Sequence, residues 1–174
     1  RHGLEIIHTR EIPTHGGSIR VYAARKGKFK VTKAVKKQFK LEKKYLNWSK
    51  FIEFRNKTVS SKLKLYKLLN SIKAKNKVIY GIGAPSRAST LINYVGLDQN
   101  IIDCVLEING SYKINHYIPG TKIPILDEKK LFRDKPDYVI LFSWHIAKEL
   151  KNNLKKKGYK GKFIIPLPSP RIEN

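Results

Sequence analysis

The sequence of 174 residues contains no methionine and a single cysteine. Since a translated chain begins with an initiator methionine, we expect residues upstream of Arg1 in the complete protein. Cys104 lies in an apolar run and is interpreted as a buried structural thiol. Alone, it permits neither an internal disulfide nor a thiolate zinc cage within the chain. No apolar run reaches the length of a membrane-spanning helix, and no signal peptide opens the chain. These absences favour a cytoplasmic protein with no membrane partner.

Acidic residues are also few, because 13 Asp and Glu stand against 37 Lys and Arg, which gives a formal net charge of +24. Such a surplus is typical of proteins that bind nucleic acids or acidic ligands. The basic residues are mostly lysine, whereas recognition of phosphates and bases favours arginine. We therefore interpret most of the charge as solvated surface. An acidic or phosphorylated small ligand is one alternative, and a nucleic-acid-binding domain on the basic helices of residues 33–75 is another.

Hydrophobic periodicity predicts two different structures in the first 75 residues. Residues 1–30 contain two short apolar stretches around a Gly pair, which predicts two short strands and a loop at the end of an upstream domain. Residues 31–75 repeat apolar positions every three to four residues, which predicts a helical connector with lysines facing solvent. Asn47 or Ser49 is expected to cap its second helix.

Residues 76–174 alternate short apolar runs with helical segments. Near-continuous apolar strands separated by helices are typical of a parallel sheet that is covered on both faces. The sequence therefore predicts an α/β, Rossmann-like, mostly parallel sheet flanked by helices. The expected strands span residues 77–81, 101–108, 137–142 and 162–166, and the expected helices span residues 85–94, 127–132 and 145–157.

A glycine loop from Gly81 to Thr90 follows the first of these strands and opens a helix. Its glycines allow a tight turn whose amides can approach an anion at the helix N-terminus. Pro85 suits the first helical turn, and Arg87 adds a guanidinium. Glu107, at the end of the next strand, occupies the position of the ribose-binding carboxylate of dinucleotide-binding units. The segment is thus either a ligand-binding loop or a structural turn.

Two further loops are candidates for a site. His15 lies in a glycine-rich loop, where an exposed imidazole that titrates near neutral pH could serve as a general base. The alternative is an ordinary turn with a surface histidine. The segment Tyr117–Ile125 contains two prolines and is expected to lie over the carboxyl ends of the strands, where open α/β sheets bind ligands. No histidines have the spacing of metal ligands.

Taken together and in this order, these segments resemble the C-terminal region of SAM-dependent C-methyltransferases that act on nucleotide-linked deoxysugars. The resemblance extends over about residues 4 to 170, almost the whole chain. The segments that carry it are His15–Tyr22, Gly81–Ala84, Leu91–Tyr94, Tyr117–Ile125, Pro136–Val139 and Ser143–Trp144.

The resemblance implies a three-part enzyme in which an N-terminal zinc module and a central SAM-binding domain precede this chain. Zinc and SAM would then be bound mainly upstream, so we expect no cofactor in this fragment, which alone would be inactive. Its Rossmann-like domain, residues 76–174, would form the nucleotide-sugar cleft together with those upstream domains. His15 is the expected general base. The expected substrate-binding residues are Gly16, Gly17, Ser18, Arg20, Gly83, Ala84, Arg87, Tyr117 and Trp144.

Three segments depart from the family pattern. Residues 12–14 replace a Tyr and a Glu that usually precede the histidine, His145 replaces an Asn, and residues 107–109 replace Asp-Arg-Asn. These departures leave the expected fold unchanged. They keep open the alternative that the chain is a non-catalytic module that binds a nucleotide or a sugar phosphate.

Overall fold

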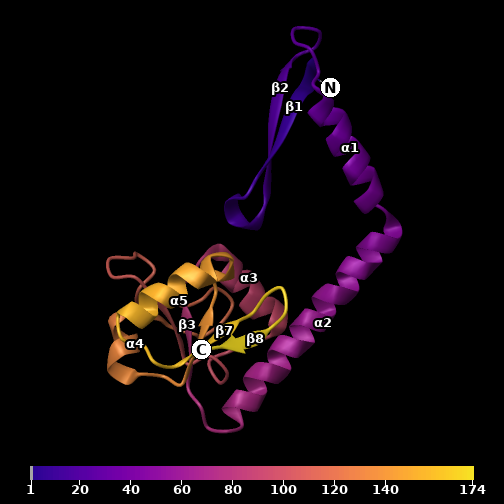
Figure 1. Cartoon of the computed structure of the whole chain (residues 1–174). Coiled ribbons are helices and arrows are strands. Elements are labelled where there is room, and N and C mark those ends of the chain that lie inside the picture. Colours follow the sequence, from indigo (N-terminus) through magenta and orange to yellow (C-terminus); the bar gives the residue numbers. More distant parts are fainter. Residues whose placement is uncertain (1) are drawn as a thin grey trace. The chain divides into compact units, whose positions relative to one another are not determined.

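The computed structural model describes residues 2–174, and for His15 only the backbone (Figure 1). The chain divides into two compact units between Asn56 and Lys57. The division falls within the long helix α2 (Trp48–Lys73). None of the helices in the described residues is both long and apolar enough to cross a membrane.

The first unit contains a β-hairpin and helix α1 (Lys33–Tyr45). Strand β1 (Leu4–Ile12) pairs antiparallel with β2 (Ser18–Arg25), and the 3-10 turn η1 (Thr14–Gly16) lies between them. The two strands expected around the Gly pair are therefore confirmed. Both are longer than predicted, and they pair with each other.

The predicted helical connector is present as α1 and α2. The Asn47 side chain caps α2, since its Oδ1 accepts a hydrogen bond from the backbone N–H of Lys50 over 3.1 Å. Such a bond satisfies one of the amides that a helix N-terminus leaves without an intrahelical partner. Along α1 only Val35 is buried. The buried residues of α2 lie in its C-terminal half and are Leu65, Leu69 and Ile72.

The second unit is built on a six-stranded sheet in the order β5-β4-β3-β6-β7-β8. All neighbouring strands are parallel except β7 and β8. Chain order reverses between β3 and β6, which makes this the topological switch point of the sheet. The predicted Rossmann-like, mostly parallel fold is thereby confirmed. The strands are β3 (Ile79–Ile82), β4 (Cys104–Glu107), β5 (Ile125–Asp127), β6 (Tyr138–Leu141), β7 (Lys162–Ile165) and β8 (Arg171–Glu173).

Helices cover both faces of this sheet (Figure 1). Helix α3 (Ser86–Val95) and the C-terminal half of α2 share one apolar cluster with the sheet. Helices α4 (Lys129–Asp134) and α5 (Ala147–Lys156) share the other. Because the four central strands β3, β4, β6 and β7 are buried on both faces, their sequences are nearly continuously apolar instead of alternating.

The described structure differs from the sequence prediction mainly at the two edges of the sheet. Neither β5 nor β8 was predicted, and both are only three residues long. The helix expected from residue 127 begins at Lys129, because residues 125–127 continue the sheet beside β4. The helix expected from His145 is preceded by the 3-10 turn η2 (Trp144–Ile146).

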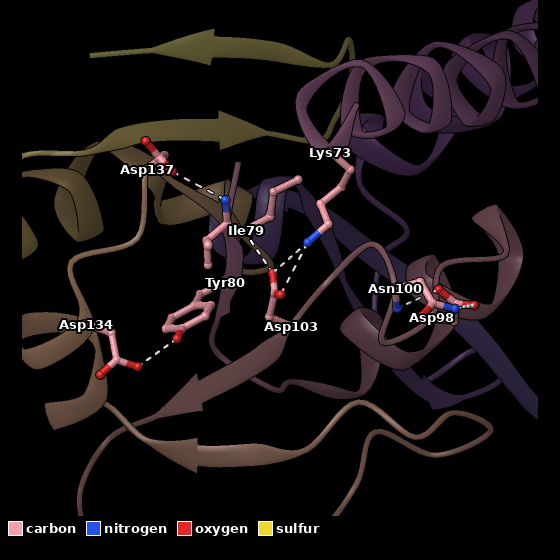
Figure 2. A network of polar contacts seen from close by, with 9 residues as sticks. Lys73, Ile79, Tyr80, Asp98, Asn100, Asp103, Asp134 and Asp137 are labelled. Atoms are coloured by element: carbon pink, nitrogen blue, oxygen red, sulfur yellow. Dashed lines mark hydrogen bonds and ion pairs between the residues drawn. The ribbon is translucent and has the colours of Figure 1, made fainter. Parts of the chain in front are cut away.

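A polar contact holds the end of α2 to the sheet (Figure 2). The Lys73 ammonium lies 3.2 Å from both carboxylate oxygens of Asp103. Oδ2 of Asp103 also accepts the backbone N–H of Ile79 over 3.0 Å. One carboxylate thus joins α2, the start of β3 and the segment before β4, which fixes the helix at the amino ends of the strands.

Candidate functional site

The predicted site residues fall into two groups, one in each unit. The first surrounds His15 in the hairpin turn, and the second lies where β3, β4 and β6 end.

The hairpin turn is closed by backbone geometry that glycine supplies. Gly16 and Gly17 have φ values of +87° and +119°, which residues with a Cβ rarely adopt. The N–H of Gly17 donates to the Thr14 carbonyl over 3.0 Å, and the Ser18 hydroxyl donates to the same carbonyl over 3.0 Å. The Ser18 hydroxyl therefore stabilises the turn by donating its proton to the turn's own backbone. Its oxygen lone pairs remain the atoms through which it could accept a bond from a ligand.

The glycine loop lies at the carboxyl end of β3. Gly83 has a φ of +80°, and its N–H donates to the Leu106 carbonyl over 2.8 Å. Pro85 is extended and directly precedes α3, whose first residue is Ser86. The expectation that Pro85 lies within the first helical turn is therefore wrong by one residue, because its ψ of 161° places it outside the helix.

Glu107 closes this loop from the neighbouring strand. Its Oε1 accepts the backbone N–H of Ala84 over 2.6 Å. The Lys113 ammonium lies 3.9 Å from the same oxygen and donates to the Ala84 carbonyl over 2.8 Å. The carboxylate is therefore bound to the protein itself, at the position where a dinucleotide-binding unit would present it to a ribose. The loop amide that an anion would need is already satisfied.

Arg87 and Trp144 meet across the switch point of the sheet. Arg87 belongs to the first turn of α3, and its guanidinium carbon lies 5.6 Å from the centroid of the Trp144 ring. Nη1 of Arg87 lies 2.9 Å from Nδ1 of His145. Because a guanidinium only donates, Nδ1 of His145 must accept, which places the imidazole proton on Nε2. An arginine held beside an indole and an imidazole can bind a phosphate or carboxylate.

Tyr117 lies apart from these residues, and the prediction that its loop covers the carboxyl ends of the strands is wrong. The segment folds back on itself, with the N–H of Ile118 donating to the Ile123 carbonyl over 2.9 Å. It then leads into the amino end of β5. The Asn93 amide, in the last turn of α3, donates to the Pro119 carbonyl over 2.9 Å. This places the loop at the amino edge of the sheet, where α3 ends.

Two cavities of different character lie at the two edges of the sheet. A hollow of about 230 Å³ at the carboxyl edge is lined by Gly83, Glu107, Lys113 and Ser143, among others. A larger hollow of about 690 Å³ lies at the amino edge, between the ends of α4 and α5. Ligands of open α/β sheets bind at the carboxyl edge, so we take the smaller hollow as the candidate.

Sequence reasoning missed several residues that the structure adds to these groups. Lys113 bonds to the glycine loop beside Glu107. His145 pairs with Arg87, although the sequence had indicated only the start of a helix at His145. Arg10 lies opposite Arg20 in the hairpin register. An exact strand register would have been needed to find Arg10, and the register of a hairpin depends on its turn geometry, which was not predicted.

Cys104 is buried in the sheet, as predicted. Burial raises the pKa of its thiol to about 12, so the thiol stays protonated and unreactive at neutral pH. Among residues 2–174, no three His, Cys, Asp or Glu side chains are grouped closely enough to hold a metal ion.

Comparison with known proteins places both groups of residues in one family. A family model described as the C-methyltransferase C-terminal domain matches residues 13–168. The C-methyltransferase NovU of Streptomyces niveus is 30% identical over 177 residues, an alignment that covers 98% of this chain. The same alignment covers 41% of NovU, so the chain spans about two-fifths of the length of that relative. The chain belongs to the family of C-methyltransferase C-terminal domains.

Proposed function

We propose that this chain is the substrate-binding part of a SAM-dependent C-methyltransferase that acts on a nucleotide-linked keto-deoxysugar, with His15 as general base. The observation that carries the proposal is the family match, because residues 13–168 include both the His15 turn and the glycine loop. The relative NovU is a C-methyltransferase, which supports carbon as the methyl acceptor. The 174-residue chain alone is expected to be inactive.

The proposed reaction needs a base more than it needs an electrophilic catalyst. A 4-keto group acidifies the proton on the neighbouring C3 atom, and the His15 imidazole takes that proton. The electron pair of the broken C–H bond is left as an enolate, which makes C3 nucleophilic. SAM, bound outside this chain, would supply a methyl group that its sulfonium already activates, so no further electrophilic catalyst would be needed. The protein contributes mainly a well-oriented acceptor carbon and a positioned base.

The second unit does not fit SAM. The Ala84 amide donates to Oε1 of Glu107 over 2.6 Å, so this amide is not free for an anion and the carboxylate is already held by the loop. The adjacent hollow of about 230 Å³ is also smaller than the roughly 300–1,000 Å³ of most ligand pockets. We therefore assign SAM, and the zinc module that the family resemblance implies, to parts of the protein outside this chain.

The hairpin supports the proposed division into an upstream methyltransferase domain ending near residue 30, a helical connector over residues 31–75 and the Rossmann-like domain of residues 76–174. An isolated two-stranded hairpin is marginal in water. Several apolar residues of this hairpin are nevertheless exposed, namely Leu4, Ile6, Ile19 and Val21. Packing of these residues on an upstream domain would bury them.

The test is methyl transfer from isotopically labelled SAM by the full-length gene product to a panel of 4-keto nucleotide-sugars. His15→Gln should lower kcat by about 10²- to 10⁴-fold, the usual contribution of a general base. His116→Gln, an exposed histidine of the second unit, is the matched control and should keep full activity. Transfer by His15→Gln at the wild-type rate would remove the base assignment.

The contact of Arg87 with His145 and Trp144 favours a second candidate function, that of a non-catalytic module for nucleotides or sugar phosphates. Calorimetry with nucleoside diphosphates, combined with the methyl-transfer assay, separates the two candidates. A pure binding module should bind them, lose affinity on Arg87→Ala and transfer no methyl group to any keto-sugar. Methyl transfer by the full-length protein rules out this second candidate.

A further inference from the structure

One face of the β1–β2 hairpin carries mostly polar residues, in a row that leads to the His15 turn. In the ladder, Ile12 faces Ser18 next to the turn, Arg10 faces Arg20 one step further, and His8 faces Tyr22 one step beyond that. Alternate residues of a strand point to the same side, so these three pairs share one face. We name the face that they form the arginine face.

The arginine pair is unusual for a hairpin. Like charges directly opposite each other in a ladder destabilise it, because the two side chains are only about 5 Å apart at their Cβ atoms. Both arginines are exposed. Within the described residues, neither guanidinium makes a hydrogen bond or an ion pair. Two adjacent guanidinium groups with free donors suit an anion with several oxygens, such as a diphosphate.

Composition makes the choice of arginine informative. The chain has 29 Lys but 8 Arg, so a merely solvated cation would most often be lysine here. Arginine differs from lysine in its planar, forked donors, which match phosphate oxygens in pairs.

The neighbouring pairs match the other parts of a nucleotide-sugar. The Tyr22 side chain is 40% exposed, and its ring centroid lies 5.4 Å from that of His8. The His8 ring is itself held by Thr32, with Nδ1 and Oγ1 2.9 Å apart. A fixed and exposed aromatic pair of this kind offers a surface on which a base can stack.

Successive pairs on one face of a strand are about 7 Å apart. From the far end of the hairpin toward the turn, the arginine face presents an aromatic pair, then a guanidinium pair, then the Ser18 hydroxyl and the His15 turn. A nucleotide-sugar has its base, its diphosphate and its sugar in the same linear order. The sugar would then lie at the turn that contains the proposed base.

We propose that the arginine face binds the nucleotide-sugar lengthwise, with Arg10 and Arg20 on the diphosphate and Tyr22 on the base. This inference rests on the proposed function for the identity of the ligand. Arg10 lies outside the family motifs, and the roles of Arg10 and Tyr22 are assigned from the strand register. On the opposite face of the same hairpin, Ile19 faces Glu11 and Val21 faces Thr9, so that face has no pair of cations.

The test measures binding of thymidine diphosphate and uridine diphosphate to the full-length gene product by calorimetry. Arg10→Gln and Arg20→Gln should each weaken binding by about 10- to 100-fold, as expected for the loss of charge-assisted hydrogen bonds. Arg25→Gln is the matched control, since Arg25 is exposed and on the same strand but faces Leu4 on the opposite side. It should change the Kd less than twofold.

Two further measurements separate the roles of the residues. Tyr22→Leu should weaken the binding of the nucleoside diphosphates but leave the binding of inorganic pyrophosphate unchanged, because pyrophosphate has no base. Arg10→Lys should restore only part of the affinity lost in Arg10→Gln. Thermal unfolding of each variant checks that the hairpin remains folded. If Arg10→Gln proves unfolded, Arg10→Lys replaces it, and full affinity in that variant overturns the paired-donor role.

Failure of this inference can be told apart from failure of the proposed function. Equal losses in Arg10→Gln and Arg25→Gln would show diffuse attraction by a basic surface and would overturn the arginine face. An unchanged KM for a keto nucleotide-sugar in Arg10→Gln, with methyl transfer intact, would do the same while leaving the methyltransferase proposal in place. Arg10-dependent binding in a protein that transfers no methyl group would support the arginine face and overturn the methyltransferase proposal.

Discussion

At the scale of single residues, the glycine loop shows why an acidic residue in a Rossmann position need not bind a ribose. Glu107 occupies the expected place after the second strand, but its Oε1 accepts the Ala84 amide over 2.6 Å. The sequence predicted both the loop and the acid. The contact between them depends on Lys113, which approaches from 29 residues away in sequence, and no local pattern reveals a partner at that separation.

This contact can be tested by hydrogen exchange. Glu107→Ala should speed exchange of the Ala84 amide by about 10- to 100-fold, since a hydrogen bond to a charged group contributes about 1.5–3 kcal/mol. Glu107→Gln keeps an acceptor oxygen and should show a smaller increase. Amide exchange followed by NMR provides the measurement. An Ala84 amide that exchanges equally fast in wild type and Glu107→Ala would contradict the contact.

Gly81 offers a test of close packing under the same loop. A Cβ at this position would lie 2.6 Å from Cε2 of Phe142 and 2.8 Å from Cγ2 of Val105. Gly81→Ala should therefore lower the free energy of unfolding by about 1–3 kcal/mol, the usual cost of overpacking. Urea unfolding measures this change in the free energy of unfolding.

The matched background for this test is Val105→Ala, which removes one of the two crowding groups. The cost of Gly81→Ala should be smaller there than in wild type, as expected for residues in contact. Equal costs in the two backgrounds would mean that Val105 does not restrict this site.

At the scale of elements, helix α2 has both buried and exposed apolar positions, and its periodicity alone does not separate the two kinds. Its predicted apolar positions include both Leu63 and Leu69, yet Leu69 is fully buried against the sheet and Leu63 is 61% exposed. Leu69→Ala should lower the free energy of unfolding by about 2–5 kcal/mol because it leaves a cavity. Leu63→Ala is the control in the same helix and should cost about 0.5 kcal/mol or less. Comparable losses in the two variants would contradict the packing of α2.

The edge strands show where sequence prediction reached its limit. Strands β3, β4, β6 and β7 were predicted because burial on both faces gives them continuous apolar runs. Strand β5 has three residues and begins after Pro124, too few to establish a period. The loop of Tyr117 was consequently placed at the wrong edge, because its position depends on the strand that follows it.

At the scale of the whole molecule, carboxylates paired with lysine and arginine set the acid stability of the second unit. Hydrogen bonds from Lys130, Arg133 and Tyr80 hold the pKa of Asp134 far below its usual value. The Lys77 ammonium lowers the pKa of Asp137. A carboxyl group with a lowered pKa in the folded state stabilises the fold above its unfolded pKa of about 4, and that stabilisation is lost as pH falls through the folded value.

The free energy of unfolding should therefore decrease as pH falls from about 5 to 2. Asp134→Asn should flatten this dependence, because an amide does not titrate. Urea titrations at several pH values measure the effect. Glu149→Gln removes an exposed carboxylate of α5 that has no ion pair in the described part of the chain, and it serves as the control. A steeper or unchanged pH dependence in Asp134→Asn would contradict the role of the Asp134 cluster.

The family and the fold of the second unit were accessible from sequence, because ordered motifs and strand periodicity both survive in a single chain. The hydrogen bond between the glycine loop and Glu107 and the pairing of the two arginines could not be predicted from the sequence, because both depend on contacts between strands. The proposed methylation depends on His15 as the base, which the family motif marks, and abstraction of the C3 proton by His15 can be measured without methyl transfer.

Deuterium exchange at C3 of a 4-keto nucleotide-sugar tests the central claim most directly. In D2O, with S-adenosylhomocysteine in place of SAM, the full-length gene product should catalyse incorporation of one deuterium at C3, observable by NMR. His15→Gln should slow this exchange by about 100-fold or more, and His116→Gln should exchange as the wild type does. Exchange by His15→Gln at the wild-type rate would contradict the assignment of His15 as the base.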